Sequence, residues 1–190
     1  MRIKCCGITR PEDARYAEVC GADAIGVVVF TPASLRAVTP ERAREIFDAV
    51  GPFTTRVAVS HTTSDDDLKQ ILSLYPDAIQ ISHPFVFRKK PGTNVIRVVS
   101  RNDPMPTSCD AIIVDESHGS GRNFDLSHAR DLVQRSKVPV ILAGGLDPEN
   151  VADAIRQVRP YAVDVASGIE KVPGIKDHRK IAAFIAAARS

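Results

Sequence analysis

Short apolar runs alternate with longer amphipathic stretches from one end of the chain to the other. Each apolar run is short enough for a buried strand, and each amphipathic stretch has the length of a helix. This alternation is typical of parallel strands joined by crossover helices. We expect strands at residues 2–6, 24–30, 55–59, 77–81, 94–98, 110–114, 139–142 and 161–165. We expect helices over residues 10–20, 40–50, 64–75, 125–136, 147–158 and 176–189.

Two of the connections between these strands are unsuited to a full helix. Residues 82–93 contain two prolines and a glycine, and residues 99–109 have the composition of a loop. Eight strands in a chain of 190 residues predict a compact (β/α)8 TIM barrel, a fold that usually needs about 250 residues. We therefore expect one α/β catalytic domain over residues 1–190, with short fourth and fifth crossovers. An open doubly wound sheet shows the same alternation, and the number of strands only weakly favours the barrel.

The charge and cysteine content narrow the class of protein further. The 25 basic and 23 acidic side chains are spread along the chain and give a net charge of +2, so neither nucleic acid nor a membrane surface is an expected partner. No apolar signal segment follows Met1, which indicates a cytoplasmic protein. The four cysteines, at positions 5, 6, 20 and 109, lack the spacing of a zinc site. We expect reduced thiols, no bound metal, and a monomer or homodimer.

The candidate functional residues follow the strands, at the end of the barrel where this fold holds its active sites. They are Cys6, Arg36, Gln80, Asp115, Gly144, Gly145, Ser167 and Gly168. The last four follow strands seven and eight, where backbone N–H groups bind phosphate in many such barrels. A small phosphorylated substrate is therefore expected. The alternative is that these glycines only relieve tight turns, and the same alternative applies to Gly119 and Gly121.

Acid–base chemistry has two candidates on opposite sides of the barrel mouth. Cys6 ends the first expected strand, and its thiol can act as a base if its pKa is lowered. Asp115 follows the sixth strand and can act as an acid if desolvation raises its pKa. Arg36, in the loop after strand two, could bind a carboxylate through two hydrogen bonds, or could be an ordinary surface arginine.

Strand alternation also predicts which residues face the barrel interior. Lys4 shares a face with Cys6, and Asp164 lies on the neighbouring last strand, so we expect a buried Lys4–Asp164 ion pair below the site. Cys5 points the other way and should be a packing residue.

The segment Lys4–Thr9 resembles the K-[IV]-C-G-[IL]-[TR] signature of phosphoribosylanthranilate isomerases. The likeness covers the chain from the first strand to the last helix. It continues through Gly26–Phe30, Ser34–Arg36, Val114–Asp115, Gly119–Gly121, Leu142–Leu146, Asp164–Glu170 and Pro173–Asp177.

The resemblance implies the isomerisation step of tryptophan biosynthesis, an Amadori rearrangement of N-(5-phosphoribosyl)anthranilate that needs no cofactor. It implies that Asp115 protonates the ribose ring oxygen and that Cys6 then removes the C2 proton. It further implies that Arg36 binds the anthranilate carboxylate, and that the phosphate is bound by backbone amides. These belong to Gly144, Gly145, Ser167 and Gly168, with support from Gly119–Gly121. At strand four the family often reads V-Q-L-H-G; Gln80 matches this pattern, and no role is transferred to Ser82 or His83.

Three other functions stay open. A Schiff-base lyase of the same fold would use Lys4 as its amine, although Lys4 lies deeper than the rim. A phosphometabolite-binding or partner-binding domain would need neither the acid nor the base. An isomerase of histidine synthesis performs the same chemistry, but it generally uses two rim aspartates and resembles two half-barrels, and no such repeat is visible here.

Overall fold

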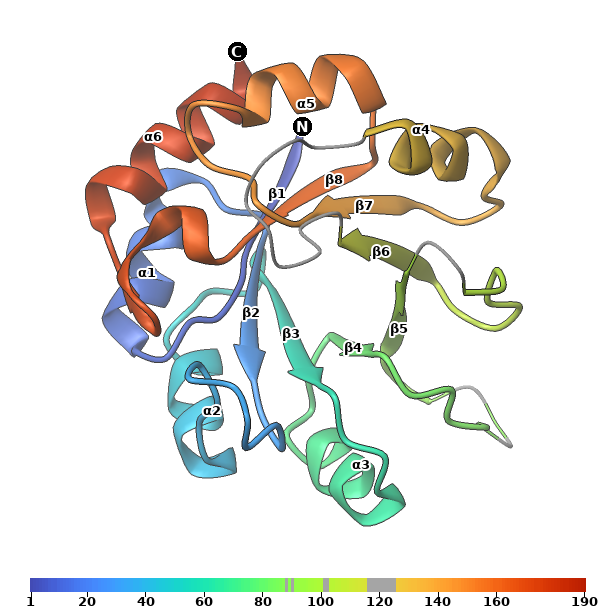
Figure 1. The fold of residues 1–190 in the computed structure, drawn as a ribbon. Coiled ribbons are helices and arrows are strands. Elements are labelled where there is room, and N and C mark those ends of the chain that lie inside the picture. The colour runs from blue at the N-terminus through green and yellow to red at the C-terminus, as the bar shows by residue number, and fades with distance from the viewer. Residues whose placement is uncertain (88, 90, 101–102, 116–125) are drawn as a thin grey trace.

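The computed structural model describes residues 1–87, 89, 91–100, 103–115 and 126–190. Eight parallel strands form a closed barrel in sequence order, and β1 pairs with both β2 and β8 (Figure 1). The predicted barrel is therefore confirmed, and the open sheet is excluded. The strands are β1 (Arg2–Cys5), β2 (Ala24–Val28), β3 (Thr55–Ser60), β4 (Ala78–Ile81), β5 (Asn94–Val99), β6 (Ala111–Asp115), β7 (Val140–Ala143) and β8 (Ala162–Val165).

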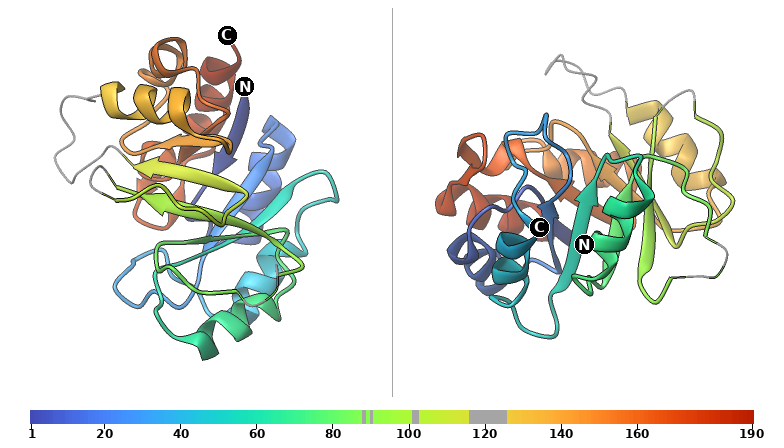
Figure 2. Two further views of the ribbon diagram at one scale, coloured as in Figure 1. Left: turned by 90° about the vertical axis from the view of Figure 1, so that its right-hand side faces the viewer. Right: turned by 90° about the horizontal axis from the view of Figure 1, so that it is seen from below.

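The helices lie outside the strands in all three views (Figures 1 and 2). Pro11 and Pro40 stand at the first helical positions of α1 and α2, where proline costs no hydrogen bond. The hydroxyl of Ser64 accepts the backbone N–H of Asp67 and caps α3. The helices are α1 (Pro11–Cys20), α2 (Pro40–Phe47), α3 (Asp65–Leu72), α4 (Leu126–Arg135), α5 (Val151–Val158) and α6 (His178–Arg189). None of the described helices is long and apolar enough to cross a membrane.

The fourth and fifth crossovers hold no helix among their described residues, as the sequence predicts. Loop side chains cover this side of the barrel instead, and Phe85, Phe87 and Met105 pack against the core. Because these two crossovers are short, a closed barrel of eight strands fits in a chain of 190 residues.

The apolar interior divides into two clusters on either side of the strands. One fills the barrel itself with mostly small or β-branched residues and includes Cys6, Val57 and Ala143. The other lies between the strands and the helices and includes Cys5, Phe47 and Phe184. Cys5 is thus a packing residue and Cys6 faces the barrel interior, as strand alternation predicts.

Several expected elements are shorter in the structure, β2, α2, α3 and α5 among them. Two further differences lie beside Cys6 and Lys176. Strand β1 ends at Cys5, although the N–H of Cys6 still donates to Val165 O at 2.8 Å. The last helix begins at His178 and not at residue 176, because Lys176 belongs to a small antiparallel pair. That pair consists of β9 (Glu170–Val172) and β10 (Ile175–Lys176), and it follows a single 3-10 turn, η1 (Ser167–Ile169).

Candidate active site

A buried ion pair lies below the carboxyl end of the barrel. Lys4 and Asp164 stand opposite each other in the register of β1 and β8, and Lys4 Nζ donates to Asp164 Oδ1 at 2.6 Å. Both side chains are less than a tenth exposed. Burial alone would lower the pKa of Lys4, but the charges of Asp164 and Cys6 and the hydrogen bonds to them outweigh it and raise that pKa. The predicted ion pair is confirmed, and Lys4 is held in its charged form.

Cys6 lies just above this pair, at the mouth of the barrel. Burial raises the pKa of its thiol, and the negative charge of Asp164 raises it further. The charge of Lys4, a hydrogen bond from Lys4 and the charge of Lys176 lower the same pKa. The pKa of Cys6 therefore lies above its ordinary value in this structure, whereas the sequence analysis made base catalysis depend on a lowered one. Its lysine neighbours are the groups that favour the thiolate.

Gly26 on β2 provides the space in which these groups meet. A Cβ at this position would lie 2.8 Å from Cys6 Sγ and 3.1 Å from Lys4 Nζ. Because real Cβ atoms do not approach sulfur so closely, any larger residue would displace the thiol or the ammonium group. Gly26 belongs to a segment that resembles the family, but this role could not be predicted from its position in the sequence.

Asp115 is the last residue of β6, where the sequence analysis placed it. Strand β6 lies three positions from β1 around the barrel, so Asp115 stands across the mouth from Cys6. Its side chain is exposed. The structure therefore separates an exposed carboxyl group from a buried thiol on opposite sides of one opening.

Gln80 on β4 is a buried polar residue on the inner face of the barrel, two residues after Ala78. Its Oε1 atom has no hydrogen-bond partner in the part of the chain that the structure describes. A buried acceptor without a donor is costly, so this amide is suited to accept a hydrogen bond from a ligand in the barrel.

The loops after β7 and β8 lie in direct contact. Gly144 and Gly145 have positive φ angles of 91° and 60°, which favour glycine. A Cβ at Gly168 would lie 2.0 Å from the carbonyl oxygen of Leu146. The turn-only interpretation of these glycines thus has a physical basis, and it does not exclude phosphate binding by the same backbone. Ser167 begins η1 and is exposed, and Gly119 and Gly121 lie outside the described residues.

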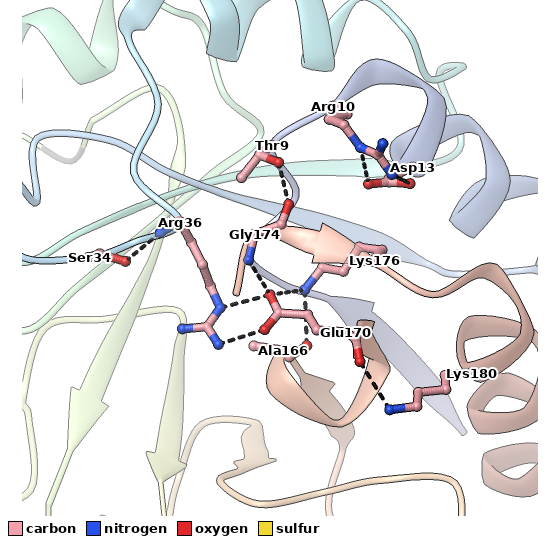
Figure 3. A network of polar contacts seen from close by, with 10 residues as sticks. All are labelled: Thr9, Arg10, Asp13, Ser34, Arg36, Ala166, Glu170, Gly174, Lys176 and Lys180. Carbon is pink, nitrogen blue, oxygen red and sulfur yellow. Dashed lines mark hydrogen bonds and ion pairs between the residues drawn. The ribbon is translucent and has the colours of Figure 1, made fainter. Parts of the chain in front are cut away.

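Arg36 binds a carboxylate of the protein itself (Figure 3). Its Nε donates to Glu170 Oε1 at 2.8 Å, and its Nη2 donates to Glu170 Oε2 at 2.7 Å. Glu170 Oε1 also accepts Lys176 Nζ at 3.0 Å and the N–H of Gly174 at 3.1 Å. Burial opposes the charge of Glu170, yet the hydrogen bond from Arg36 and the charge of Lys176 keep the pKa of this carboxyl below its ordinary value.

The roles of Glu170 and Lys176 were not predicted from the sequence. Both stand in segments that resemble the family, but nothing in their spacing shows that they meet Arg36. The predicted two-pronged geometry of Arg36 is present, with Glu170 as the partner rather than an external carboxylate. Within the described ranges, no three His, Cys, Asp or Glu side chains are grouped as metal ligands would be.

The structure is a closed barrel with a buried thiol, two lysines and several carboxyl groups at its carboxyl end. Enzymes of the (β/α)8-barrel class have their active sites at this end, and this chain has the fold and the site of that class. The family model described as N-(5'phosphoribosyl)anthranilate (PRA) isomerase matches residues 3–187. The chain therefore belongs to the N-(5'-phosphoribosyl)anthranilate isomerase family.

Individual relatives agree with this assignment. The N-(5'-phosphoribosyl)anthranilate isomerase of Methanoregula boonei is 65% identical, over all of this chain and 97% of the relative. The crystal structure of phosphoribosyl anthranilate isomerase from Thermus thermophilus superposes with a TM-score of 0.85 at 35% identity, covering 100% and 98% of the two chains. A phosphoribosyl anthranilate isomerase in complex with reduced 1-(o-carboxyphenylamino)-1-deoxyribulose 5-phosphate matches with a TM-score of 0.83 at 34% identity, with the same coverage.

Proposed function

We propose that this chain converts N-(5'-phosphoribosyl)anthranilate to 1-(2-carboxyphenylamino)-1-deoxyribulose 5-phosphate in tryptophan biosynthesis, with Cys6 as general base and Asp115 as general acid. The observation that carries the assignment of roles is the buried thiol beside Lys4 on one side of the barrel mouth, opposite an exposed carboxyl group on the other. An Amadori rearrangement needs one group to donate a proton and another to accept one, on different atoms of the sugar.

The reaction then proceeds by ring opening, C2 deprotonation and conversion of the enolamine to the ketone. Asp115 donates a proton to the ribose ring oxygen while the C1–O bond breaks, and the nitrogen lone pair forms a C1=N iminium. Cys6 removes the C2 proton, and the electrons of that C–H bond form the C1=C2 bond of an enolamine. Protonation at C1 and loss of the proton from the C2 hydroxyl give the ketone. The positive iminium acidifies the C2 proton and favours the thiolate, which offsets the burial of Cys6.

The substrate carries two anionic groups at its ends, a carboxylate and a phosphate. Arg36 binds the carboxylate. The backbone N–H groups of Gly144, Gly145, Ser167 and Gly168 bind the phosphate, with support from Gly119–Gly121, and Gln80 accepts a hydrogen bond from the sugar. The complex of a family member with a reduced carboxyphenylamino-deoxyribulose phosphate supports a ligand of this shape.

The chain acts as one catalytic domain without a cofactor, as a monomer or homodimer in the cytoplasm. The four free cysteines fit a reducing compartment. One structure similar to this chain is of monomers generated from a dimeric relative in Thermotoga maritima.

The lyase alternative loses support from the state of Lys4. A Schiff base requires a neutral amine, but the hydrogen bond to Asp164 and the raised pKa of Lys4 keep its ammonium group charged.

The identity of the product tests this function directly. Substrate is generated in situ from anthranilate and a phosphoribosyl donor labelled with ¹³C at C2, and the reaction is followed by NMR. We expect the labelled carbon to change from a carbinol to a ketone while the mass of the molecule stays the same. Release of free anthranilate, or an unchanged carbinol signal with well-folded protein, would contradict the proposal.

A further inference from the structure

Arg36 has two edges that can bind a carboxylate, and Glu170 takes only one of them. The Nε and Nη2 atoms face Glu170, whereas Nη1 points away from it (Figure 3). Nη1 donates to no group among the described residues, and one N–H of Nη2 also remains. One N–H of Nη1 and the remaining N–H of Nη2 form a second edge of the guanidinium group. This edge can bind a carboxylate through two parallel hydrogen bonds.

A substrate carboxylate is not expected to displace Glu170. The Glu170 side chain is only 5% exposed, and its two oxygens together accept four hydrogen bonds. Moving Arg36 away would leave this buried carboxylate with only Lys176 and one backbone N–H, at a large cost. The outer edge of Arg36 is therefore the edge open to an incoming anion.

Arg36, Glu170 and Lys176 form a charged cluster, and its charges also favour binding of an external anion. Arg36 and Lys176 are both cationic groups that bind Glu170, whose pKa they lower, although burial lowers the pKa of Lys176. Lys176 is fully buried and also donates to Ala166 O at 3.0 Å, which fixes it below Glu170. The cluster thus keeps one uncompensated positive charge, and Arg36, with a side chain 27% exposed, is where that charge reaches solvent.

The cluster is built next to the catalytic thiol. A Cβ at Gly7, the residue after Cys6, would lie 2.5 Å from Arg36 Cδ, so the stem of Arg36 crosses directly over this glycine. The positive φ of Gly7, 69°, favours glycine at this position. The direction in which Glu170 turns the guanidinium group therefore decides where an anion sits relative to Cys6.

We propose that Glu170 is a positioning residue that fixes Arg36 with its outer edge toward the substrate and thereby selects substrates that carry an aromatic carboxylate. The inference rests on the proposed role of Arg36 in binding that carboxylate. Lys176 holds Glu170 in place from below. Glu170 itself touches neither the substrate nor the reacting atoms.

A double-mutant cycle of Glu170 and Arg36, measured by steady-state kinetics, tests the positioning role of Glu170. Glu170→Gln should raise KM for phosphoribosylanthranilate about tenfold or more, with kcat within about threefold, because the lost contact is made equally in the ground and transition states. Arg36→Met should raise KM at least as much. The double variant should match Arg36→Met, because Glu170 acts only through that arginine.

Substrate choice provides a readout that a purely structural role would not change. N-(5-phosphoribosyl)aniline lacks the carboxylate. Glu170→Gln should therefore reduce the preference for the anthranilate compound over the aniline compound by about tenfold. Lys180→Met is the matched control, because Lys180 donates to the backbone oxygen of Glu170 at 3.0 Å and not to its carboxylate. It should leave this preference unchanged.

The outcomes separate the two proposals. If Arg36→Met raises KM but Glu170→Gln does not, or if the two effects add fully, the positioning role is wrong and the proposed function stands. If Arg36→Met leaves KM unchanged, the proposed role of Arg36 fails and the inference fails with it. Should Glu170→Gln fold poorly, Glu170→Gln/Lys176→Met removes both buried charges and must show the same loss of preference.

Discussion

At the scale of single residues, Cys6 lies between charges that act on its thiol in opposite directions. Burial and Asp164 raise its pKa, whereas Lys4 and Lys176 lower it. The two largest charge effects come from residues that are themselves paired, because Lys4 Nζ donates to Asp164 at 2.6 Å. The pKa of Cys6 can therefore be raised or lowered by substituting Lys4 or Asp164 one at a time.

Lys4→Met should make Cys6 less reactive, and Asp164→Asn should make it more reactive. Losing the Lys4 cation raises the pKa of Cys6, so the rise of kcat/KM with pH moves to higher pH and iodoacetamide alkylates the thiol more slowly at a fixed pH. Losing the Asp164 charge has the opposite sign. Tandem mass spectrometry of the proteolytic peptide that contains Cys5 and Cys6 reports the two thiols separately. Shifts in the same direction for both variants would contradict this account.

Lys4→Met also leaves Asp164 as a buried carboxylate without its ion-pair partner. We expect a loss of about 3 to 5 kcal/mol in the free energy of unfolding, measured with urea. The kinetic comparison is therefore made at a temperature where circular dichroism shows both variants folded.

At the scale of elements, the loops after β7 and β8 meet at a close backbone contact. Gly168 in η1 lies so close to Leu146 that no side chain fits between them. The sequence could indicate that glycine was needed here, but it could not distinguish a turn from a phosphate site. The choice depends on which other loop lies against the glycine, and only the closed barrel determines this.

Gly168→Ala should destabilise the protein and weaken substrate binding together. Its Cβ would lie 2.0 Å from Leu146 O, so η1 must move away from the β7 loop, at a cost of about 1 to 3 kcal/mol. KM should rise because the backbone N–H groups proposed for phosphate move with it. Gly92→Ala is the matched control, since a Cβ there meets no atom within 4 Å. Urea unfolding and KM measure both effects, and an unchanged KM would argue against phosphate binding by this turn.

Contacts between elements differ in how far the sequence could predict them. The Lys4–Asp164 pair followed from barrel closure and strand alternation, which together place the two residues side by side. The Arg36–Glu170 pair joins residues 134 positions apart, one in the loop after β2 and one at the start of the short strand β9 outside the barrel. No periodicity governs such loops, so the sequence indicated a two-pronged arginine but not its partner.

At the scale of the whole molecule, the barrel is covered unevenly. Helices pack around most of the strands, but the described parts of the fourth and fifth crossovers contain none (Figure 1). The sequence predicted this feature well, because prolines and loop composition exclude helices from both connections. The alternation of apolar runs and the number of strands weakly favoured the barrel over an open sheet, and β2, α2, α3 and α5 are shorter than expected.

Because helices cover the strands unevenly, we expect the backbone amides of the strands to be protected unevenly against hydrogen exchange. We expect amides of β4 and β5 to exchange with deuterium faster than those of β1, β2 and β8 under native conditions, because local opening there exposes less packed surface. Hydrogen exchange read by mass spectrometry measures this for each strand. Equal protection around the barrel would show that Phe85, Phe87 and Met105 replace the missing helices fully.

The most direct test of the central claim is turnover of phosphoribosylanthranilate generated in situ, followed by the loss of its fluorescence. The wild type is compared with Cys6→Ala, Asp115→Asn and Cys5→Ala. The account predicts turnover by the wild type, a loss of about 10²-fold or more in kcat for the Cys6 and Asp115 variants, and little change in kcat for Cys5→Ala. Near-wild-type turnover by Cys6→Ala, or a well-folded wild type without activity, would contradict it.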